Sequence, residues 1–375
     1  MNLLITGGAG FIGTHLSRAL LHRGHSVTVL DNFSPQIHGN NGELPLDLRD
    51  DVRLVRGDIR DADIWAATVP GHQAIVNLAA ETGTGQSMYE IAKYEQVNVA
   101  GTSLLYDFLA RSPGHGVERI VVASSRAIYG EGAYHCQEHG LVYPSSRPSL
   151  DKTNGFYDPL CPICVGPCDP APTPESAPFQ PSSFYGLTKQ VQEQMTLLFA
   201  RSMNIPSIAL RYQNVYGPGQ SLKNPYTGIL AIFSNQARAN EPIFIFEDGK
   251  ESRDFVYIAD VVEATCRSIE VPFQGAASLN IGTGIPVSVS QVVDGVVSYF
   301  KSESDVSITG SFREGDIRHA CADTARSQDV LDFVPTCEFA AGIQKFLTWV
   351  TTQDLYQRDY ERSLEEMRKR GLLHG

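Results

Sequence analysis

The glycine-rich turn near the start of the chain constrains its fold most. Glycines stand at positions 7, 10 and 13, between the apolar run Asn2-Leu3-Leu4-Ile5 and the helix-like segment 14–20. A strand, a glycine turn and a helix in this order are the context that a dinucleotide-binding fingerprint requires. The glycines permit a tight turn that brings backbone N–H groups against a pyrophosphate, and the positive end of the helix dipole faces the phosphates. The sequence therefore predicts a dinucleotide site at Gly7, Gly10, Phe11, Ile12 and Gly13.

An acidic residue follows the second apolar run of the chain. Ser26-Val27-Thr28-Val29-Leu30 reads as a buried strand, and Asp31 stands at its end. A carboxylate in this position can accept hydrogen bonds from the adenine ribose hydroxyls, and its charge repels a 2′-phosphate. We therefore expect NAD to be the cofactor rather than NADP.

Strand-like and helix-like segments alternate through the first two hundred residues. Segments 52–56, 74–78, 119–123 and 207–211 read as strands, each followed by candidate ligand-binding residues. These are Asp58 and Ile59, Ala79 and Ala80, Ser124 and Ser125, and Tyr212. The alternation predicts an α/β Rossmann fold, with a doubly wound parallel sheet, helices on both faces and ligands at the carboxyl ends of the strands.

Composition limits the partners and the location of the protein. The chain has 375 residues, 42% hydrophobic and 19% charged, and a formal net charge of −12. An acidic balance argues against nucleic acid as a partner, and phosphate would have to be bound by a few local arginines and amides. No apolar run is long enough for a membrane span, and the fingerprint starts at residue 6, so we expect a cytoplasmic protein without signal peptide or membrane partner. The seven cysteines are then expected to be free thiols or metal ligands.

Residues 131–182 interrupt the alternation. This stretch contains ten prolines and is too long for an ordinary connection. It lies between two candidate catalytic elements, so we expect an insertion without regular structure, above or beside the active site. We call residues 131–182 the insertion.

The insertion carries two short metal-ligand spacings. Cys136 and His139 form a C-x2-H pair, and Cys161 and Cys164 form a C-x2-C pair. Two such pairs can make a closed four-coordinate site, which predicts a structural Zn²⁺ away from the hydride chemistry. Cys168 or His135 could replace one ligand. The alternatives are free cytosolic thiols in a loop or, less favoured, a redox sensor.

After Tyr212 the elements become shorter and mixed. We expect strands at 243–246 and 279–281 and helices at 258–269 and 288–300. This predicts an NAD-binding domain over 1–212, to which 251–270 could return, and a smaller mixed α/β substrate-binding lobe over 213–375. In the tail, 351–370, a helical pattern places Tyr356, Tyr360, Leu364 and Met367 on one side, where they would pack on the body.

The second informative motif is Tyr185-Gly186-Leu187-Thr188-Lys189. On a helix, residues four apart share a face, so the phenol and the ammonium would lie together. A neighbouring ammonium lowers a tyrosine pKa and makes the phenolate usable as a base. A purely structural interpretation explains the apolar face of this helix but not the Tyr–Lys pair. The motif follows a glycine fingerprint and Ser124-Ser125, so we interpret the pair as catalytic.

These motifs together resemble the extended short-chain dehydrogenase/reductase superfamily, in its nucleotide-sugar epimerase/dehydratase branch. The motifs that carry the resemblance are Thr6 to Gly13, Asp31-Asn32, Gly57-Asp58-Ile59, Asn77 to Ala80, Asn98 to Thr102, Ser124 to Gly130, Tyr185 to Lys189, Arg211 to Pro218, Arg253 to Val256 and Arg313 to Asp316. They span roughly residues 1–350. The resemblance implies a nucleotide-diphosphate sugar as substrate and a homodimer formed through helices at about 93–111 and 184–203.

The resemblance also implies roles for individual residues. Ser125, Tyr185 and Lys189 would be catalytic. The residues expected at NAD are Gly7, Gly10, Phe11, Ile12, Gly13, Asp31, Asn32, Asp58, Ile59, Leu78, Ala79, Ala80, Asn98, Ser124, Tyr185, Lys189 and Tyr212. Those expected at the substrate are Gly85, Ser87, Met88, Arg126, Asn214, Arg253, Arg313 and Asp316.

The residues after Ser125 favour one reaction of this branch. Its dehydratases carry an Asp-Glu pair directly after the catalytic Ser/Thr, and its decarboxylases usually place a glutamate in the same segment. Arg126-Ala127 stands there instead. Epimerisation needs neither acid, so we expect an NAD-dependent 4-epimerase that works through a transient 4-keto sugar. A dehydratase or decarboxylase, and an NAD-binding protein without turnover, are the alternatives.

Overall fold

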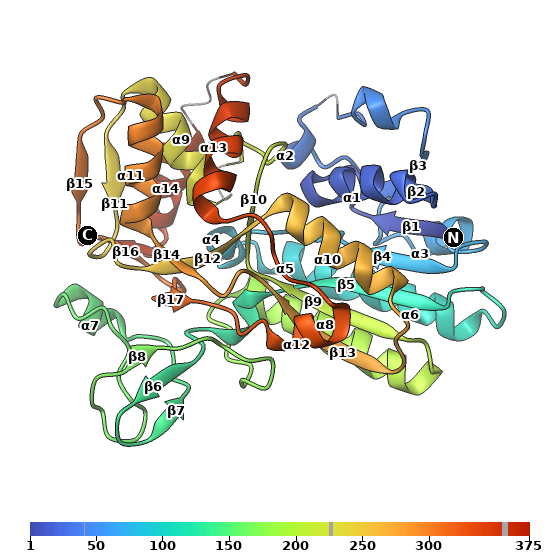
Figure 1. The fold of residues 1–375 in the computed structure, drawn as a ribbon, viewed down its shortest axis with the longest axis horizontal. Helices are drawn as coiled ribbons and strands as arrows, with labels where there is room; N and C mark the ends of the chain where they lie inside the picture. The colour runs from blue at the N-terminus through green and yellow to red at the C-terminus, as the bar shows by residue number, and fades with distance from the viewer. Residues whose placement is uncertain (41, 225–227, 355–358) are drawn as a thin grey trace.

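The centre of the fold is a seven-stranded parallel sheet (Figure 1). The computed structural model describes residues 1–40, 42–224, 228–354 and 359–375. In spatial order the strands of the sheet are β13 (Ala276–Ile281), β9 (Ser207–Tyr212), β5 (Arg119–Ser125), β4 (Ala74–Asn77), β1 (Asn2–Thr6), β2 (Ser26–Asp31) and β3 (Arg53–Arg56). The order reverses between β1 and β4, and ligands bind at such a point in open α/β sheets.

Helices cover both faces of this sheet, as the alternation predicts. Leu3 and Ile5 of β1 pack with α1 (Phe11–His22) and α10 (Ile258–Glu270), whereas Leu4 packs with α3 (Ala62–Thr68) and α6 (Gly101–Arg111). Because successive strand residues point to opposite faces, a strand covered on both sides is apolar throughout. This explains the unbroken run Leu3-Leu4-Ile5, which is fully buried. The fold class predicted from the sequence is confirmed.

The first part of the chain contains several short helical elements and one long helix. They are α2 (Pro35–His38), α4 (Thr84–Ser87), α5 (Ile91–Tyr94), a π-helical turn at Glu95–Ala100, 3-10 turns at Leu46–Leu48 and Arg126–Tyr129, and the long α8 (Phe184–Met203). The Ser183 hydroxyl accepts a hydrogen bond from the Gly186 N–H and so caps the start of α8. At the other end Asn204 adopts the left-handed conformation common after helices. These caps fix the register of Tyr185 and Lys189.

The later part of the chain forms a group of small sheets and helices. Its strands are β10 (Asn214–Tyr216), β11 (Ile243–Ile245), β12 (Ser252–Tyr257), β14 (Pro286–Ser288), β15 (Val306–Ile308), β16 (Phe312–Arg313), β17 (His319–Ala320) and β18 (Leu373–His374). Its helices are α9 (Ile229–Ala239), α11 (Val289–Phe300), α12 (Ala325–Leu331), α13 (Phe339–Val350) and α14 (Asp359–Lys369). A four-stranded sheet joins β10, β12 and β14, with β17 beside β12.

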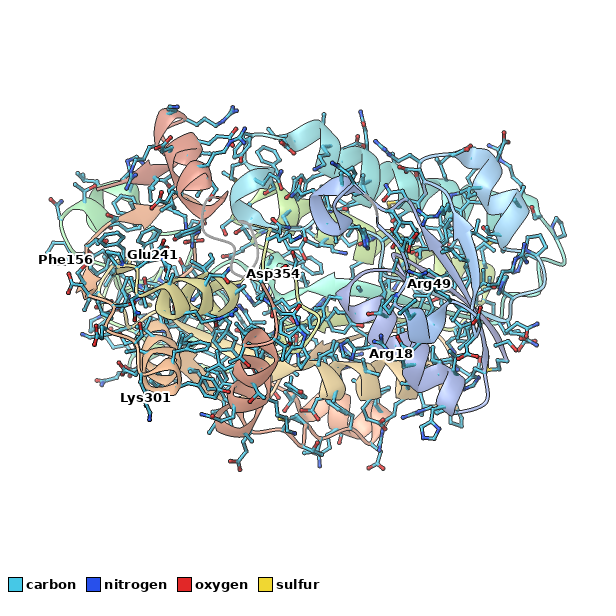
Figure 2. The ribbon with its side chains drawn as sticks, turned by 90° about the horizontal axis from the view of Figure 1, so that it is seen from above. Arg18, Arg49, Phe156, Glu241, Lys301 and Asp354 are labelled. Atoms are coloured by element: carbon cyan, nitrogen blue, oxygen red, sulfur yellow. The ribbon has the colours of Figure 1, made fainter. Side chains whose placement is uncertain are left out.

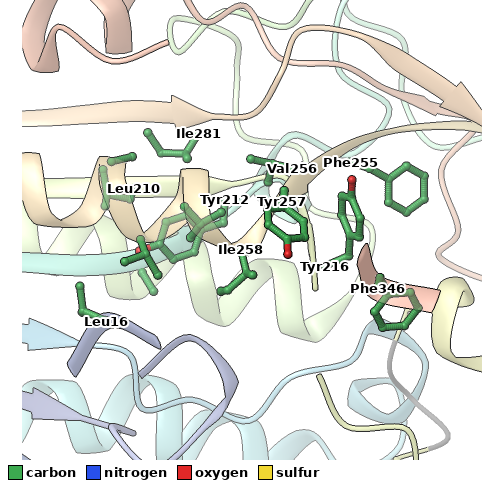
Figure 3. Packing of buried hydrophobic residues seen from close by; sticks show 14 of the residues in the cluster. Leu16, Leu210, Tyr212, Tyr216, Phe255, Val256, Tyr257, Ile258, Ile281 and Phe346 are labelled. Atoms are coloured by element: carbon green, nitrogen blue, oxygen red, sulfur yellow. The ribbon is translucent and has the colours of Figure 1, made fainter. Parts of the chain in front are cut away.

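Two of the later elements lie with the central sheet. α10 packs on α1, and β13 pairs along its whole length with β9, from Ala276–Ser207 to Ile281–Tyr212. Within the range 251–270, which could return to the NAD-binding domain, α10 lies against α1, whereas β12 pairs with β10, β14 and β17 in a smaller sheet. One apolar cluster joins both parts: Figure 3 shows Leu16 of α1 and Leu210 of β9 near Ile258, with Tyr216 and Phe346 beyond. The division of the chain at residue 212 remains a proposal.

The insertion contains more regular structure than its prolines suggest. It forms a three-stranded antiparallel sheet in the order β7 (Gly140–Val142), β6 (Tyr134–Cys136) and β8 (Asp169–Pro170), and the short helix α7 (Ser149–Thr153). The strands are only two or three residues long, and β8 ends on Pro170, so the expectation of no regular structure was too strict. Figure 1 shows this unit at one end of the molecule, below β16 and β17. In Figure 2 its Phe156 lies at the same end as Glu241 and Lys301, opposite Arg18 and Arg49.

The C-terminal tail packs on the body as expected. Leu364 and Met367 of α14 are buried in a small cluster with Leu373, Phe246 and Tyr360. Tyr356, the remaining residue of the predicted apolar side, lies outside the described residues. Within the described ranges, no helix is long and apolar enough to cross a membrane.

Candidate functional site

A cavity of about 360 Å³ opens at the carboxyl ends of β1, β2, β4 and β5. Of the residues that the sequence assigns to NAD, all but Asn98 line it. They are Gly7, Gly10, Phe11, Ile12, Gly13, Asp31, Asn32, Asp58, Ile59, Leu78, Ala79, Ala80, Ser124, Tyr185, Lys189 and Tyr212. The catalytic candidate Ser125 lines the same cavity. These residues come from the turns and strand ends at β1, β2, β3, β4, β5 and β9 and from helix α8, which are far apart in sequence, so the fold brings the predicted set together.

The glycine turn leaves no room for side chains at two of its positions. Gly7 has φ +66°, and a Cβ there would lie 2.8 Å from the Ala79 nitrogen. A Cβ at Gly13 would lie 2.5 Å from the Gly8 Cα, where α1 crosses the turn. The Asp31 carboxylate accepts hydrogen bonds from the Ala9 N–H at 3.0 Å and the Phe33 N–H at 2.8 Å. Asp31 therefore orders the fingerprint turn and also lines the expected ribose side of the cavity.

Asp58 lines the cavity directly, whereas Asn98 supports its wall from behind. Asp58 accepts from Asn32 Nδ2 at 3.0 Å and from the Arg60 guanidinium at 2.7 and 2.9 Å. The hydrogen bond to Arg60 is the main cause that holds the pKa of Asp58 well below its usual range. Asn98 is fully buried and exchanges hydrogen bonds with the Glu81 N–H and C=O, at 2.8 and 3.1 Å. It thus holds the backbone of the cavity wall rather than facing the cavity.

The three catalytic candidates all line this cavity. Ser125 ends β5, and its Oγ accepts from the Ala127 N–H at 3.1 Å. Tyr185 and Lys189 occupy successive turns of α8, which packs against β5. The Lys189 ammonium donates to the Ala123 carbonyl at 2.7 Å and to Gln192 Oε1 at 2.8 Å. A serine hydroxyl and a tyrosine phenol thus face one cavity, with a lysine held beneath them.

Burial shifts the pKa values of both Lys189 and Tyr185. Burial lowers the pKa of Lys189 to about 7. Burial also raises the pKa of Tyr185, against the lowering effects of the Ser125 hydrogen bond and the Arg126 charge. The groups that act on the pKa of Tyr185 are thus the surrounding packing, Ser125 and Arg126. The lowering of this pKa by Lys189 stays a prediction.

The charged substrate candidates converge beyond Ser125. Arg126 Nε donates to Asn214 Oδ1 at 2.6 Å, and burial with the nearby Arg253 lowers the pKa of Arg126 to about 9. Arg313 pairs with Asp316 at 2.9 Å. Arg253 donates to the Ile317 carbonyl at 2.8 Å. Three arginines that lie close together, Arg126, Arg253 and Arg313, can bind a dianion such as a diphosphate.

The remaining substrate candidates lie between this group and the C-terminal helix. A Cβ at Gly85 would lie 3.3 Å from Met367 Sδ of α14. The Ser87 hydroxyl is turned inward and donates to the Thr84 carbonyl at 2.6 Å. Met88 Sδ lies 3.9 Å from the position of a Cβ at Gly315. The fold thus places Met88 near the Arg313–Asp316 segment, while Ser87 is bonded within its own turn.

Several cavity residues were missed in the sequence. Gln213 and Gln220 line the cavity, and within the described residues the Oε1 atom of each is buried without a hydrogen-bond partner. A buried unpaired acceptor is a candidate for a ligand donor. Gln213 stands inside the Arg211-Tyr212-Gln213-Asn214 motif, so the motif could have assigned it to the cavity. Gln220 follows the turn Gly217-Pro218-Gly219 in the later part of the chain, and no pattern linked it to the site.

The four predicted metal ligands are brought together in the insertion. Their ligand atoms, on Cys136, His139, Cys161 and Cys164, all lie within 4.8 Å of one another. Cys136 Sγ lies 3.6 Å from His139 Nδ1 and 3.7 Å from Cys164 Sγ, and Cys161 Sγ lies 3.7 Å from His139 Nδ1. Thiolate and imidazole groups in this arrangement suit a tetrahedral divalent ion.

The comparisons with known proteins agree with this geometry. Residues 3–149 and 163–282 match the model of the NAD dependent epimerase/dehydratase family. The chain therefore belongs to this family of NAD-binding nucleotide-sugar enzymes, and more closely to its 4-epimerases, which are isomerases.

Individual relatives cover nearly the whole chain. It is 37% identical over 357 residues to a dTDP-L-rhamnose 4-epimerase of Burkholderia thailandensis, covering 94% of this chain and 95% of the relative. It is 28% identical to a putative UDP-glucose 4-epimerase of Methanocaldococcus jannaschii, covering 93% and 98%.

Solved structures of nucleotide-sugar enzymes also match nearly the whole chain. The UDP-glucose 4-epimerase of Thermotoga maritima with UDP-glucose matches with a TM-score of 0.77 at 27% identity, over 94% of this chain and 99% of that one. MoeE5 in complex with UDP-glucuronic acid and NAD matches with a TM-score of 0.75 at 28% identity and the same coverage.

Proposed function

We propose that this protein is an NAD-dependent nucleotide-sugar 4-epimerase that acts through a transient 4-keto sugar, on dTDP-L-rhamnose or a related sugar. The observation that carries the proposal is the placement of Ser125 and Tyr185 on one cavity, with Arg126-Ala127 following directly. NAD, when bound, would supply a reversible hydride acceptor for the sugar carbon. The cavity lining, with the glycine turn and Asp31, fits such a cofactor.

In this proposal each side chain has a defined task. Ser125 hydrogen-bonds the sugar 4-hydroxyl and then the keto oxygen, while Tyr185 removes the hydroxyl proton as general base. Since burial raises the pKa of Tyr185, the phenolate must be stabilised by neighbouring groups. The Ser125 hydrogen bond and the Arg126 charge both lower this pKa and so stabilise the phenolate. Lys189 lines the cavity, is held by Ala123 and Gln192, and would contact the nicotinamide ribose.

Similarity supports the choice of sugar nucleotide. The relative with dTDP-L-rhamnose in its name shares 37% of residues, more than the UDP-glucose epimerases quoted above. The test is a screen of UDP-, dTDP- and GDP-sugars in deuterated water. Epimerisation of dTDP-L-rhamnose without deuterium at C5 supports the proposal. Solvent deuterium at C5 indicates dehydration-type chemistry, and no reaction with any sugar favours a binding protein without turnover.

We further propose that the insertion holds a structural Zn²⁺ on Cys136, His139, Cys161 and Cys164. With Zn–S bonds of about 2.3 Å, the ligand atoms of a tetrahedral site lie about 3.5 to 3.8 Å apart. The contacts of 3.6, 3.7 and 3.7 Å match those edges. Elemental analysis of protein purified without a metal-binding tag should find about one zinc per chain, and less than about one tenth would refute the site.

A homodimer in the cytoplasm completes the proposal. α8 exposes Leu187 and Leu198, which lie about three turns apart and so on one side of a helix expected at the interface. Exposed apolar side chains on one side of a helix suit burial against a second copy. Light scattering at micromolar concentration should give twice the chain mass of 41.0 kDa, and a monomer mass would contradict the dimer.

A further inference from the structure

We propose that the insertion is a rigid frame that positions the segment 312–320, which carries substrate-binding candidates, and that Arg147 is the positioning residue. The proposed zinc site on Cys136, His139, Cys161 and Cys164, which we call the metal clip, holds the frame together. The inference rests on the proposed nucleotide-sugar site, because segment 312–320 carries Arg313 and Asp316. Neither the hydride chemistry nor NAD binding requires the insertion in this proposal. Its effect is on the geometry with which the nucleotide sugar is held.

The insertion contacts the segment directly at both of its ends. Near its start, the Glu131 carboxylate accepts from the Arg318 N–H at 2.7 Å. Near its end, the Ser182 hydroxyl donates to the Gly315 carbonyl at 2.8 Å. Gly315 has φ +80°, and a Cβ there would lie 2.9 Å from the Ser182 carbonyl oxygen, so the two backbones pack without space for a side chain. The Ser149 hydroxyl adds a bond of 2.6 Å to Glu314.

Arg147 links these contacts from inside. Its side chain is 3% exposed and bonds Glu131 at 2.8 Å, Glu247 at 2.8 Å and the Asp316 carbonyl at 3.0 Å. Glu131 and Glu247 are both buried; Arg147 is the charge partner of Glu131, and it shares Glu247 with Arg318. A planar five-donor group that bonds four acceptors at once, the Tyr157 carbonyl among them, allows little movement of any of them. Arg147 therefore fixes the backbone of the segment at Asp316, and Glu131 fixes it at Arg318.

This backbone carries the diphosphate candidates. Arg313 and Asp316 belong to the segment, and Arg253 donates to its carbonyls at Ile317 and Arg318, at 2.8 and 3.0 Å. A shift of the segment would move all three charged side chains together. Preorganisation of this kind increases ligand affinity because the ordering cost is met before binding.

The metal clip closes the loop in which Arg147 lies. Cys136 and His139 precede Arg147 in the chain, and Cys161 and Cys164 follow it. Joining the two arms at one ion reduces the conformational freedom of the loop between them. The same arms carry Glu131, just before β6, and Tyr157, whose carbonyl accepts from Arg147 at 2.9 Å. Loss of the metal should therefore loosen Arg147 and, through it, segment 312–320.

Hydrogen exchange of the full-length protein tests the frame without any substrate. In Arg147→Met, and in the milder Ser149→Ala/Ser182→Ala variant, amides of 312–320 should exchange at least about tenfold faster, while β1 and β5 remain protected. Arg119→Met is the matched control, since Arg119 anchors three carbonyls of segment 268–273 elsewhere. Unchanged exchange at 312–320 in the serine variant, or an equal rise in the control, would overturn the proposal.

Metal removal tests the clip. The purified protein is treated with a chelator while its zinc content is followed. Exchange should rise both within 134–170 and at 312–320. A rise confined to 134–170, or a protein that contains no zinc as purified, overturns the part assigned to the clip.

Ligand binding distinguishes positioning from general damage. In calorimetry, the affinity for dTDP should fall at least about tenfold in the serine variant, while NAD affinity stays within about twofold. If the wild-type protein turns over the sugar, KM should rise with kcat little changed. If the wild type binds neither dTDP nor UDP, the proposed function fails, and the exchange data alone still decide on the frame. An equal loss of NAD and dTDP affinity would contradict positioning.

Discussion

The buried carboxylate of Glu251 yields a quantitative prediction about pH. Glu251 is 7% exposed, directly precedes β12, and its Oε2 lacks a hydrogen-bond partner among the described residues. Burial, reinforced by the charge of Glu247, raises its pKa from 4.5 to about 7, against the lowering effect of Arg253 and Arg318. The unfolded chain releases this proton near pH 4.5, whereas the folded protein keeps it to about pH 7. Folded-state stability should therefore fall as pH rises through this window.

Replacing Glu251 by glutamine removes this dependence. The difference between a pKa of 4.5 and one of about 7 corresponds to about 3 kcal/mol, the full penalty above pH 7. At pH 8 the Glu251→Gln protein should thus be about 3 kcal/mol more stable than the wild type, and at pH 5.5 only about 1 kcal/mol. The difference shrinks at low pH because the wild-type carboxyl is then neutral in both states.

Urea unfolding of both proteins at pH 5.5 and pH 8 measures the effect. Comparing the variant with the wild type at each pH cancels the titration of all other groups. Glu303→Gln, the same change at an exposed position, controls for loss of a negative charge from the chain. A stability difference between Glu251→Gln and wild type that is the same at both pH values, or larger at pH 5.5, would refute the reasoning.

Three further predictions concern the proposed reaction. Tyr185→Phe should bind NAD normally yet lose epimerisation by about 10²- to 10⁴-fold, and near-normal turnover would remove Tyr185 from the mechanism. Because Asp31 lines the cavity and is bonded to Ala9 and Phe33, NAD should bind at least about a hundredfold more tightly than NADP; equal affinities would exclude this role for Asp31. Arg126→Met should raise KM for the nucleotide sugar at least about tenfold without changing NAD affinity, and an unchanged KM would place the sugar nucleotide elsewhere.

The sequence by itself determined the parts of the site that depend on local geometry. Strand–turn–helix order, the acid after β2 and the Tyr-x3-Lys spacing are local patterns, and each places a side chain at a strand or helix end. These ends meet at one edge of a parallel sheet, so sixteen of the seventeen residues assigned to NAD line one cavity. The short Cys/His spacings likewise each require only one tight turn.

Tertiary structure decided the features that arise from burial and distant contacts. Asn98 belongs to a recognised motif, but its contact with Glu81 turns it into a support for the cavity wall. The pKa of Tyr185 is raised although Lys189 is one turn away, because desolvation depends on everything packed around the phenol. Arg147 lies in an irregular stretch without any motif, yet it joins Glu131, Glu247 and Asp316. No local pattern encodes such a network, because its partners lie up to 169 residues away and meet only in the folded chain.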